Sequence, residues 1–145
     1  MSLSRSQLLF SAQAFCDAFR DAKPIDEILG HFSSTDGVVA IEHGLPQLAP
    51  FLGRNFSGLD GVKQYFETIS SVLKYKDMCF SGFVVDEEAR KASMKGKACF
   101  TWLSTGQSWD EVFAYTLDFD AEGKIKKYEV WADSGAAYLA GRGEL

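Results

Sequence analysis

The hydrophobic pattern changes its period about halfway along the chain, and this change is the strongest constraint on the fold. Between Leu8 and Leu73, apolar residues recur at the three- and four-residue spacings of helices with one buried face. Between Met78 and Trp131, apolar and polar residues alternate, as they do in strands. Helices followed by strands predict an α+β fold, with the helices packed on one face of a strongly curved antiparallel sheet.

The pattern also places the expected elements. Three helices are expected first, over residues 4–21, directly after Pro24 and over residues 58–73. A short strand over 38–41 and a loop over 45–58 separate the second helix from the third. Four antiparallel strands are expected at 78–85, 92–102, 109–119 and 125–131, and a short last helix at 135–140.

Composition narrows the class of protein. A chain of 145 residues that is 46% hydrophobic fits one domain over residues 1–145 and is too apolar for general disorder. The net charge of −5 and the lack of a basic run argue against a nucleic-acid partner. The N-terminal segment resembles an amphipathic helix more than a signal peptide, and no run is long enough to span a membrane, so we expect a cytoplasmic protein without a membrane partner. Twelve Phe residues require a large core or a cavity that they can line.

The cysteines and the short motifs point to chemistry without a bound group. Cys16, Cys79 and Cys99 are far apart and odd in number, which favours reduced, buried thiols over a zinc site or a disulfide framework. No P-loop, dinucleotide-binding or metal-ligand spacing occurs. We therefore expect no cofactor and no metal.

Alternation along the strands predicts which side chains share a face. One face carries Met94, Gly96, Ala98, Phe100, Trp102, Phe113, Tyr115, Leu117 and Phe119. In the last strand we expect Trp131 to point inward, and Glu129 and Asp133 share its parity, although carboxylates in a ring-lined interior need a partner or a function. The outer face would then carry Val112, Ala114, Tyr128, Val130 and Ala132, an apolar set that predicts a homodimer surface.

The two histidines differ in context. His31 follows the second helix and has the position of a helix-end residue. His43 lies just past the first strand and before a proline-containing loop, where a side chain can reach a ligand. A neutral imidazole there could act as a general base, and the alternative is a structural histidine bonded to the loop backbone.

Several local strings resemble one superfamily. They are FLGRNFSG at residues 51–58, Gly61-Val62, Tyr65-Phe66, FDAEGKI at residues 119–125 and Trp131-Ala132-Asp133. With the order of elements, they resemble the NTF2-like superfamily and, within it, the SnoaL-like and ketosteroid-isomerase-like cone folds. The resemblance covers nearly the whole chain and implies three helices and a bent sheet around an apolar pocket, usually in a homodimer. The superfamily includes isomerases, cyclases, dehydratases, epoxide hydrolases and non-catalytic binders, so it does not imply one function.

The resemblance also implies site residues. His43 has the place of the general base of ketosteroid isomerases, and Tyr115 has the place of a carboxylic acid that stabilises the oxyanion. The other oxyanion donor, a tyrosine in those enzymes, falls near Phe15 and Cys16, and their pocket tryptophan matches Trp131. At two of the three catalytic positions this chain has a different kind of side chain from the ketosteroid isomerases. This difference argues against steroid isomerisation and leaves acid–base chemistry in the pocket open.

The remaining candidate site residues each allow a functional and a structural interpretation. Asp133 could act as an acid or base, as in some SnoaL-like cyclases, or could cap the last helix, which is the commoner use of such an Asp. Glu129 could face the pocket or pair with Lys127 or Arg54, and Glu111 could lie at a solvated strand end. The rings at Phe66, Phe100, Trp102, Phe113, Tyr115 and Trp131 fit both a plain core and ligand contacts.

Two classes of function follow from these residues. In the first, the chain is a cofactor-independent acid–base enzyme, of the isomerase, cyclase or dehydratase type, that acts on a small hydrophobic ligand with His43 as base and Tyr115 as oxyanion donor. In the second, it is a non-catalytic ligand-binding or dimerisation module of the same fold.

Overall fold

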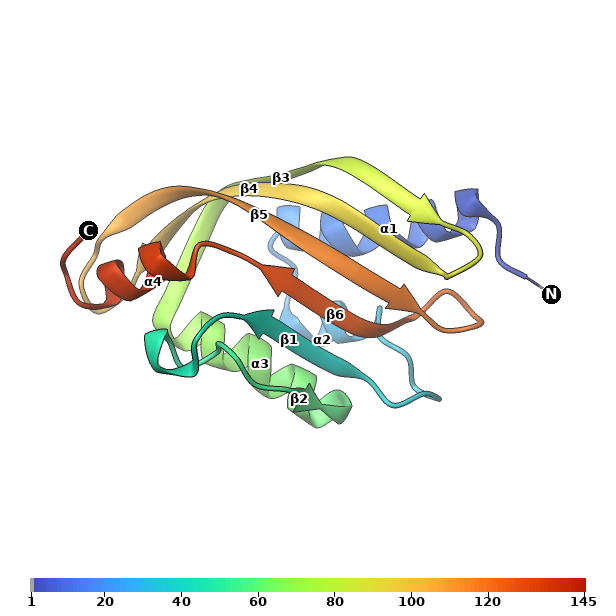
Figure 1. Ribbon diagram of the computed structural model, residues 1–145, viewed down its shortest axis with the longest axis horizontal. Coiled ribbons are helices and arrows are strands. Elements are labelled where there is room, and N and C mark those ends of the chain that lie inside the picture. Colours follow the sequence, from blue (N-terminus) through green and yellow to red (C-terminus); the bar gives the residue numbers. More distant parts are fainter. Residues whose placement is uncertain (1) are drawn as a thin grey trace.

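The computed structural model describes residues 2–145 (Figure 1). Its helices are α1 (Arg5–Arg20), α2 (Ile25–Leu29), α3 (Gly58–Val72) and α4 (Ser134–Gly141), with a short 3-10 helix, η1, at Pro46–Leu48. Its strands are β1 (Val39–His43), β2 (Phe56–Ser57), β3 (Leu73–Asp86), β4 (Lys91–Trp102), β5 (Ser108–Phe119) and β6 (Ile125–Trp131). The expected order of helices and then strands is confirmed.

The first helix forms where its periodicity predicts. Ser4 caps α1 by accepting a hydrogen bond from the N–H of Gln7, whose side chain in turn accepts from the N–H of Ser4. The apolar stripe of α1 is buried at Leu8, Ala12, Phe15, Cys16 and Phe19. Burial of this stripe against the sheet, more than helix propensity, stabilises the helix.

The six strands form one sheet in the order β2-β1-β6-β5-β4-β3. Strands β3 to β6 are the expected antiparallel meander, but β1 pairs with β6 in parallel, so the sheet is mixed rather than wholly antiparallel. A parallel pair requires a long connection between its strands, and the chain from β1 to β6 supplies one. Local patterns carry no sign of such a distant pairing.

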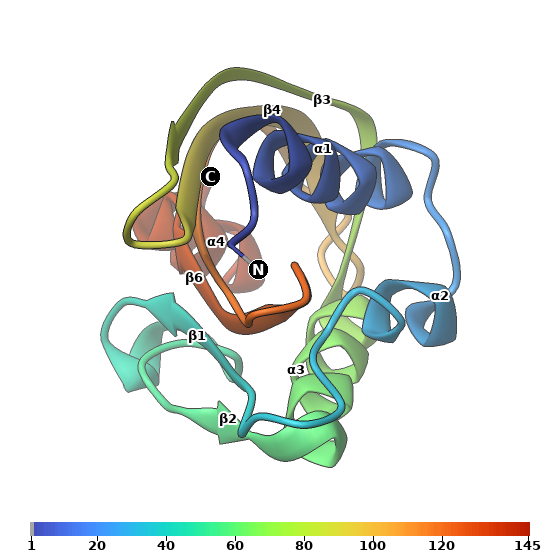
Figure 2. The ribbon, with the colours of Figure 1, turned by 90° about the vertical axis from the view of Figure 1, so that its right-hand side faces the viewer.

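The sheet curls, and the helices close its open side. Figure 2 shows β3 and β4 arching over the top and β1 at the lower left, with α1, α2 and α3 from the upper centre to the lower right. Register shifts in the β3–β4 ladder, between Lys76 and Cys79 and between Ser81 and Val84, interrupt the longest pair of strands where it bends. The expected cone is confirmed.

Strand β3 starts earlier than the sequence pattern predicts. Strand β3 begins at Leu73, directly after α3, because Leu73 pairs with Trp102 and Tyr75 pairs with Phe100. The Tyr75 hydroxyl donates to the carbonyl oxygen of Phe19 at 2.7 Å and ties the beginning of β3 to the end of α1. The sequence pattern does not predict this part of the strand, because Lys74 and Lys76 interrupt its run of hydrophobic residues.

The facing of β6 is opposite to the prediction. Tyr128 and Val130 are buried on the inner face, whereas Trp131 is 44% exposed on the outer face. The reason is register: Val130 lies opposite Tyr115, and Tyr128 lies opposite Leu117. Residues opposite each other in adjacent strands point to the same face, and Tyr115 and Leu117 belong to the core.

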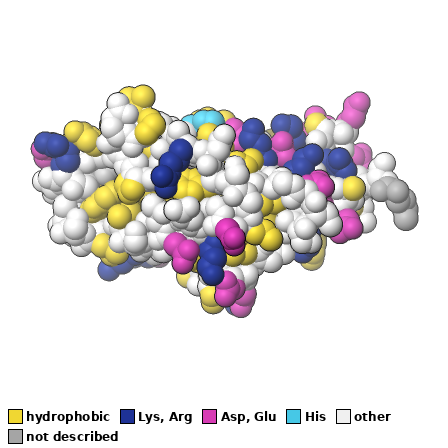
Figure 3. Space-filling model, turned by 90° about the horizontal axis from the view of Figure 1, so that it is seen from below, with side chains coloured by type: hydrophobic (Ala, Val, Ile, Leu, Met, Phe, Trp, Pro, Cys, Tyr) yellow, Lys and Arg dark blue, Asp and Glu magenta, His cyan; other side chains and the backbone are white. Residues whose placement is uncertain are grey.

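The surface mixes charges of both signs. On the face seen in Figure 3, lysine and arginine side chains alternate with acidic ones, and hydrophobic side chains lie between them. No basic surface dominates that face. Among residues 2–145, no helix combines the length and the apolar character that crossing a membrane requires.

Gly96 provides a test of the packing between β4 and the interior. A Cβ atom at Gly96 would overlap the ring of Phe113, its partner in β5. We expect Gly96→Ala to lower the free energy of unfolding by about 1–3 kcal/mol, measured by urea denaturation, because the ring must leave its place. Gly37→Ala is the matched control, since nothing lies within 4 Å of a Cβ atom there. Equal stability of the two variants would contradict the close packing at Gly96.

Candidate active site

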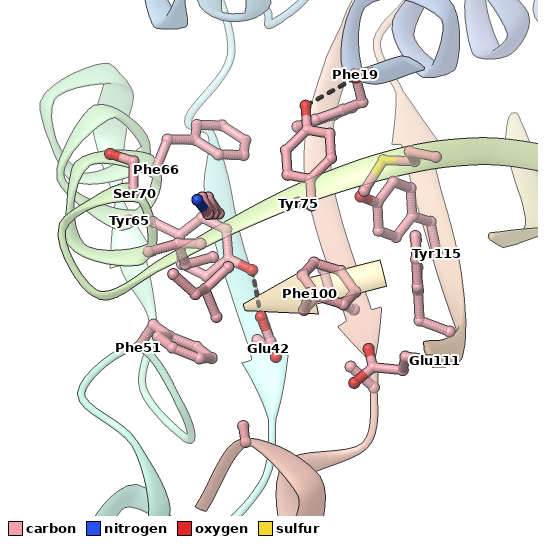
Figure 4. A pocket seen from close by; sticks show the side chains of 18 of the residues that line it. Phe19, Glu42, Phe51, Tyr65, Phe66, Ser70, Tyr75, Phe100, Glu111 and Tyr115 are labelled. Atoms are coloured by element: carbon pink, nitrogen blue, oxygen red, sulfur yellow. Dashed lines mark hydrogen bonds between the residues drawn. The ribbon is translucent and has the colours of Figure 1, made fainter. Parts of the chain in front are cut away.

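A cavity of about 390 Å³ lies between the curled sheet and the helices. Figure 4 shows its interior, with rings from α1, α3 and the strands and two carboxyl groups, Glu42 and Glu111. Its lining residues are mostly apolar or aromatic and come from every layer of the fold: Phe19, Ala22, Lys23, Ile25, Ile28, Glu42, Phe51, Tyr65, Phe66, Ile69, Ser70, Leu73, Lys74, Tyr75, Met78, Phe100, Trp109, Glu111, Phe113, Tyr115, Tyr128, Val130, Ala132, Asp133 and Ala137. Such a lining suits a small hydrophobic ligand.

Glu42 is one of the two carboxyl groups. It lies in β1, where alternation turns Ala40 and Glu42 inward, and it accepts a hydrogen bond from the Tyr65 hydroxyl at 2.6 Å. Burial raises the pKa of Glu42 to about 7; the Tyr65 hydrogen bond opposes this and the charge of Glu111 adds to it. Near neutral pH this side chain can therefore both take up and release a proton.

Glu111 is the second carboxyl group, and the sequence interpretation of it as a solvated residue is wrong. It lies early in β5, is only 8% exposed, and accepts a hydrogen bond from the indole N–H of Trp109 at 2.8 Å. Burial raises the pKa of Glu111 to about 7, the Trp109 hydrogen bond lowers it, and the charge of Asp133 raises it. Figure 4 shows Glu111 and Glu42 toward one end of the cavity, away from Phe19 and Tyr75.

Three buried tyrosines stand beside these acids. Burial is the largest cause that raises the pKa values of Tyr65, Tyr115 and Tyr128 well above the usual value. Their rings are neighbours, with centroids 4.9 Å apart for Tyr115 and Tyr128 and 6.0 Å apart for Tyr65 and Tyr128. They are neutral phenols at physiological pH, and a neutral phenol can donate a hydrogen bond to a developing negative charge.

Five of the predicted site residues line this cavity. They are Tyr115, Asp133, Phe66, Phe100 and Phe113. Asp133 also caps α4, because its side chain accepts a hydrogen bond from the N–H of Ala136 at 3.0 Å. The favoured interpretation of Asp133 as a helix cap is thus confirmed, and the same residue supplies negative charge near Glu111.

Three further predicted residues lie in the core around the cavity rather than in its wall. Phe15 packs edge-on against Tyr128, with ring centroids 5.4 Å apart. Cys16 is buried, and burial strongly raises the pKa of its thiol, so it stays protonated. Trp102 is buried with its ring against Gly141 of α4. The expectation of buried thiols holds for Cys16 only, since Cys79 is exposed and Cys99 half-buried.

His43, Glu129 and Trp131 lie together, but on the outer face of the sheet. His43 Nε2 is 2.8 Å from Glu129 Oε2, and the His43 ring stacks on Trp131 with centroids 4.6 Å apart. Burial raises the pKa of Glu129, but its hydrogen bonds with His43 and Lys127 outweigh this and lower it. Because Glu42 points inward, its neighbour His43 points outward. The expected placement of His43, Glu129 and Trp131 around the pocket therefore differs from the structure.

Sequence reasoning missed Glu42 and Glu111 although a signal for both was present. Each lies in an alternating segment at the parity of core residues, Glu42 with Ala40 and Glu111 with Phe113 and Tyr115. A charged residue at core parity is a candidate for function because its burial is unfavourable without one. Among the described residues 2–145, no cluster of three His, Cys, Asp or Glu side chains could hold a metal ion.

A curled sheet closed by helices around one cavity defines a cone-shaped α+β class of protein. No protein-family model matches the chain, and no curated protein matches it. Among solved structures, an NTF2-like protein of unknown function from Burkholderia pseudomallei has a TM-score of 0.78 at 14% identity, over 95% of this chain and 98% of that chain. These matches show that the chain has the NTF2-like fold, as its sequence strings predict.

Two other similar structures carry more specific names. TerC, co-crystallized with polyporic acid, has a TM-score of 0.77 at 18% identity, over 94% of this chain and 98% of TerC. The BvnE pinacolase from Penicillium brevicompactum has a TM-score of 0.70 at 21% identity, over 97% of this chain and 94% of BvnE. At these identities the likeness extends to the fold alone.

The raised pKa values predict how stability depends on pH. Carboxyl groups in the unfolded chain titrate near 4.5, whereas Glu42 and Glu111 titrate at about 7 in the folded protein. Between these values the folded protein holds protons that the unfolded chain has lost, so the free energy of unfolding falls as pH rises through this window. We expect Glu42→Gln/Glu111→Gln to remove this fall, a difference on the order of a few kcal/mol.

Thermal unfolding at several pH values between about 5 and 8 measures the effect. Glu67→Gln, at an exposed position of α3, is the matched control and should follow the wild-type dependence. A double variant with the same pH dependence as the wild type would contradict the raised pKa values.

Proposed function

We propose that this chain is a cofactor-independent acid–base enzyme that moves a proton on a small hydrophobic molecule held in the cavity. One observation carries the proposal: two buried carboxyl groups, Glu42 and Glu111, face an apolar cavity with pKa values of about 7. An acid or base whose pKa lies near the working pH transfers protons most effectively. The expected class of isomerases, cyclases and dehydratases needs such proton transfers.

The two carboxyl groups take different roles, one as the general base and the other as the general acid. The charge of Glu111 raises the pKa of Glu42, so ionisation of Glu111 favours the protonated form of Glu42. The ionised member removes a proton from the ligand, and the protonated member returns one to another atom. Tyr115 lines the same cavity as a neutral phenol and donates to the oxygen on which negative charge develops.

Similar structures support both the catalytic and the ligand-binding side of this proposal. BvnE is a pinacolase, and TerC was crystallized with polyporic acid. The alternative for this chain is a non-catalytic binder of the same kind of ligand, which the aromatic lining favours equally. The difference between the two lies in the basicity of the cavity, and that can be measured without the natural substrate.

Elimination of 5-nitrobenzisoxazole tests the basicity. A carboxylate removes the carbon-bound proton of this probe while the N–O bond breaks, and the reaction needs no metal or cofactor. We expect the wild-type protein to accelerate it, with a rate that rises as pH rises through about 7 and then levels off, because only the ionised carboxylate is a base. Glu42→Gln/Glu111→Gln should lower the rate by about 100-fold.

Two control variants sharpen this test. Glu67→Gln removes an exposed carboxyl group from α3 and should keep the wild-type rate. His43→Ala tests the alternative that His43 is the general base. A lower elimination rate in that variant would identify His43, and not the two glutamates, as the base. If the wild-type protein is no faster than the double variant, the proposed enzyme is refuted and the non-catalytic ligand-binding alternative remains.

We further propose that a second copy of the chain covers the outer face of β5 and β6. Val112 is 56% exposed and Trp131 is 44% exposed. Trp131 lies opposite Ala114, so both share this face with Val112. Of the five predicted members, Val112 and Ala114 are exposed here, Tyr128 and Val130 are buried inside, and Ala132 is half-buried and lines the cavity. Exposed Val and Trp side chains on one face are typical of a site that another surface covers.

Sedimentation velocity tests the homodimer. We expect a dimer for the wild type at micromolar concentration and a monomer for Val112→Glu, because a buried unpaired carboxylate at the interface is unfavourable. Leu59→Glu is the matched control, since Leu59 is a 41% exposed aliphatic residue of α3, which is not part of the sheet. A monomeric wild type would refute the dimer.

A further inference from the structure

Tyr65 and Glu42 form a buried polar pair in the wall of the cavity. Tyr65 belongs to α3 and Glu42 to β1, and both side chains are buried. The Tyr65 hydroxyl donates a hydrogen bond to Glu42 Oε1 at 2.6 Å (Figure 4). A distance this short is typical of a hydroxyl that donates to a carboxylate, which is one of the stronger hydrogen bonds in proteins.

Other rings fix the ring of Tyr65 in place. Its centroid lies 5.3 Å from that of Phe56, 5.2 Å from that of Phe66 and 6.0 Å from that of Tyr128. A ring packed this closely in a protein interior keeps one rotamer, so its hydroxyl stays in one place. Tyr65 therefore presents its proton to Glu42 from a fixed direction.

The bond leaves Glu42 with one oxygen for the cavity. Oε1 accepts from Tyr65, whereas Oε2 accepts no hydrogen bond from the described residues 2–145. Among the fully buried side-chain nitrogen and oxygen atoms of those residues, Asp118 Oδ1 alone lacks a partner, so Glu42 Oε2 is not enclosed by protein. Because Glu42 lines the cavity, Oε2 is open to it. When Glu42 is neutral, its proton lies on Oε2, since Oε1 is an acceptor.

We propose that Tyr65 is a positioning residue of this site: its hydroxyl holds Glu42 Oε1 so that Glu42 Oε2 exchanges the proton with the ligand. This inference rests on the proposed function, in which Glu42 transfers a proton. The carboxylate becomes a neutral acid when Oε2 takes up the proton, and the carboxylate forms again when Oε2 returns it. Such a group is effective only at the correct distance and direction from the reacting atom. Tyr65 acts through Glu42 and needs no contact with the ligand.

The same bond affects the acidity of Glu42. The hydrogen bond from Tyr65 lowers the pKa of Glu42 against the larger effect of burial, which raises it. Tyr65 itself stays a donor, because burial, followed by the charge of Glu42, raises the pKa of its phenol well above the usual value. Loss of the hydroxyl should therefore raise the pKa of Glu42, which a merely structural role of Tyr65 would not do.

Tyr65→Phe tests this role, because it removes the hydroxyl and keeps the ring. NMR of protein with isotope-labelled glutamate side chains follows each carboxyl group, and the signal missing in Glu42→Gln identifies Glu42. We expect Tyr65→Phe to raise the pKa of Glu42 by about one pH unit, because the ionised form loses a donor. Tyr75→Phe is the matched control: it removes another phenol hydroxyl from the cavity wall, one that donates to the carbonyl oxygen of Phe19, and should leave the pKa of Glu42 unchanged.

Elimination of 5-nitrobenzisoxazole measures the catalytic consequence. We expect Tyr65→Phe to lower the rate at pH 7 by about five- to tenfold and to move the midpoint of the pH profile upward, because less of Glu42 is ionised. In the Glu42→Gln background the same substitution should have no further effect, since Tyr65 then has no carboxylate to position. An equal loss of rate in both backgrounds would assign Tyr65 to direct contact with the ligand and overturn the proposal. Circular dichroism confirms that the variants remain folded.

The NMR measurement is independent of the test for catalysis. A raised pKa of Glu42 in Tyr65→Phe, without elimination activity in the wild type, would leave the control of Glu42 by Tyr65 in place and refute the enzyme. Elimination activity with an unchanged pKa of Glu42 in Tyr65→Phe, or with an equal rise in Tyr75→Phe, would support the enzyme and refute the positioning role.

Discussion

The pairing of β6 with β5 on one side and with β1 on the other determines which side chains reach the cavity. Because Val130 lies opposite both Tyr115 and Glu42, all three point inward. The same register sends His43 and Trp131 to the outer face, where they stack. A shift of one residue would exchange the two sets. The chemistry of the interior therefore depends on a ladder of backbone hydrogen bonds.

Burial raises the pKa values of the two inner carboxyl groups, Glu42 and Glu111. An ionised carboxylate in an apolar cavity loses the hydration that stabilises its charge, so both Glu42 and Glu111 hold their protons to about pH 7. Tyr65 and Trp109 each donate one hydrogen bond, which keeps the ionised forms accessible. On the outer face, by contrast, the hydrogen bonds of Glu129 with His43 and Lys127 lower its pKa. Location, more than residue type, decides which acid can exchange protons.

The solved structures with this fold include a pinacolase and a protein of unknown function, so the cone by itself does not select a reaction. Selection comes from the few polar groups that line an otherwise apolar cavity. In this chain those groups include the carboxyl groups of Glu42 and Glu111 and the neutral phenol of Tyr115.

Much of the fold could be predicted from the sequence, because the spacing of hydrophobic residues, three to four in helices and two in strands, is a local property. The helices, the meander, the curved sheet and a ring-rich interior follow from this spacing. The predicted interior rings include Phe66, Phe100, Phe113 and Tyr115. The site could be predicted only in part. Alternation divides each strand into two faces but does not say which face is buried, and for β1 and β6 both faces carry apolar and polar residues. Only the tertiary structure decided between Glu42 and His43, since the partner strands and the covering helices define the interior.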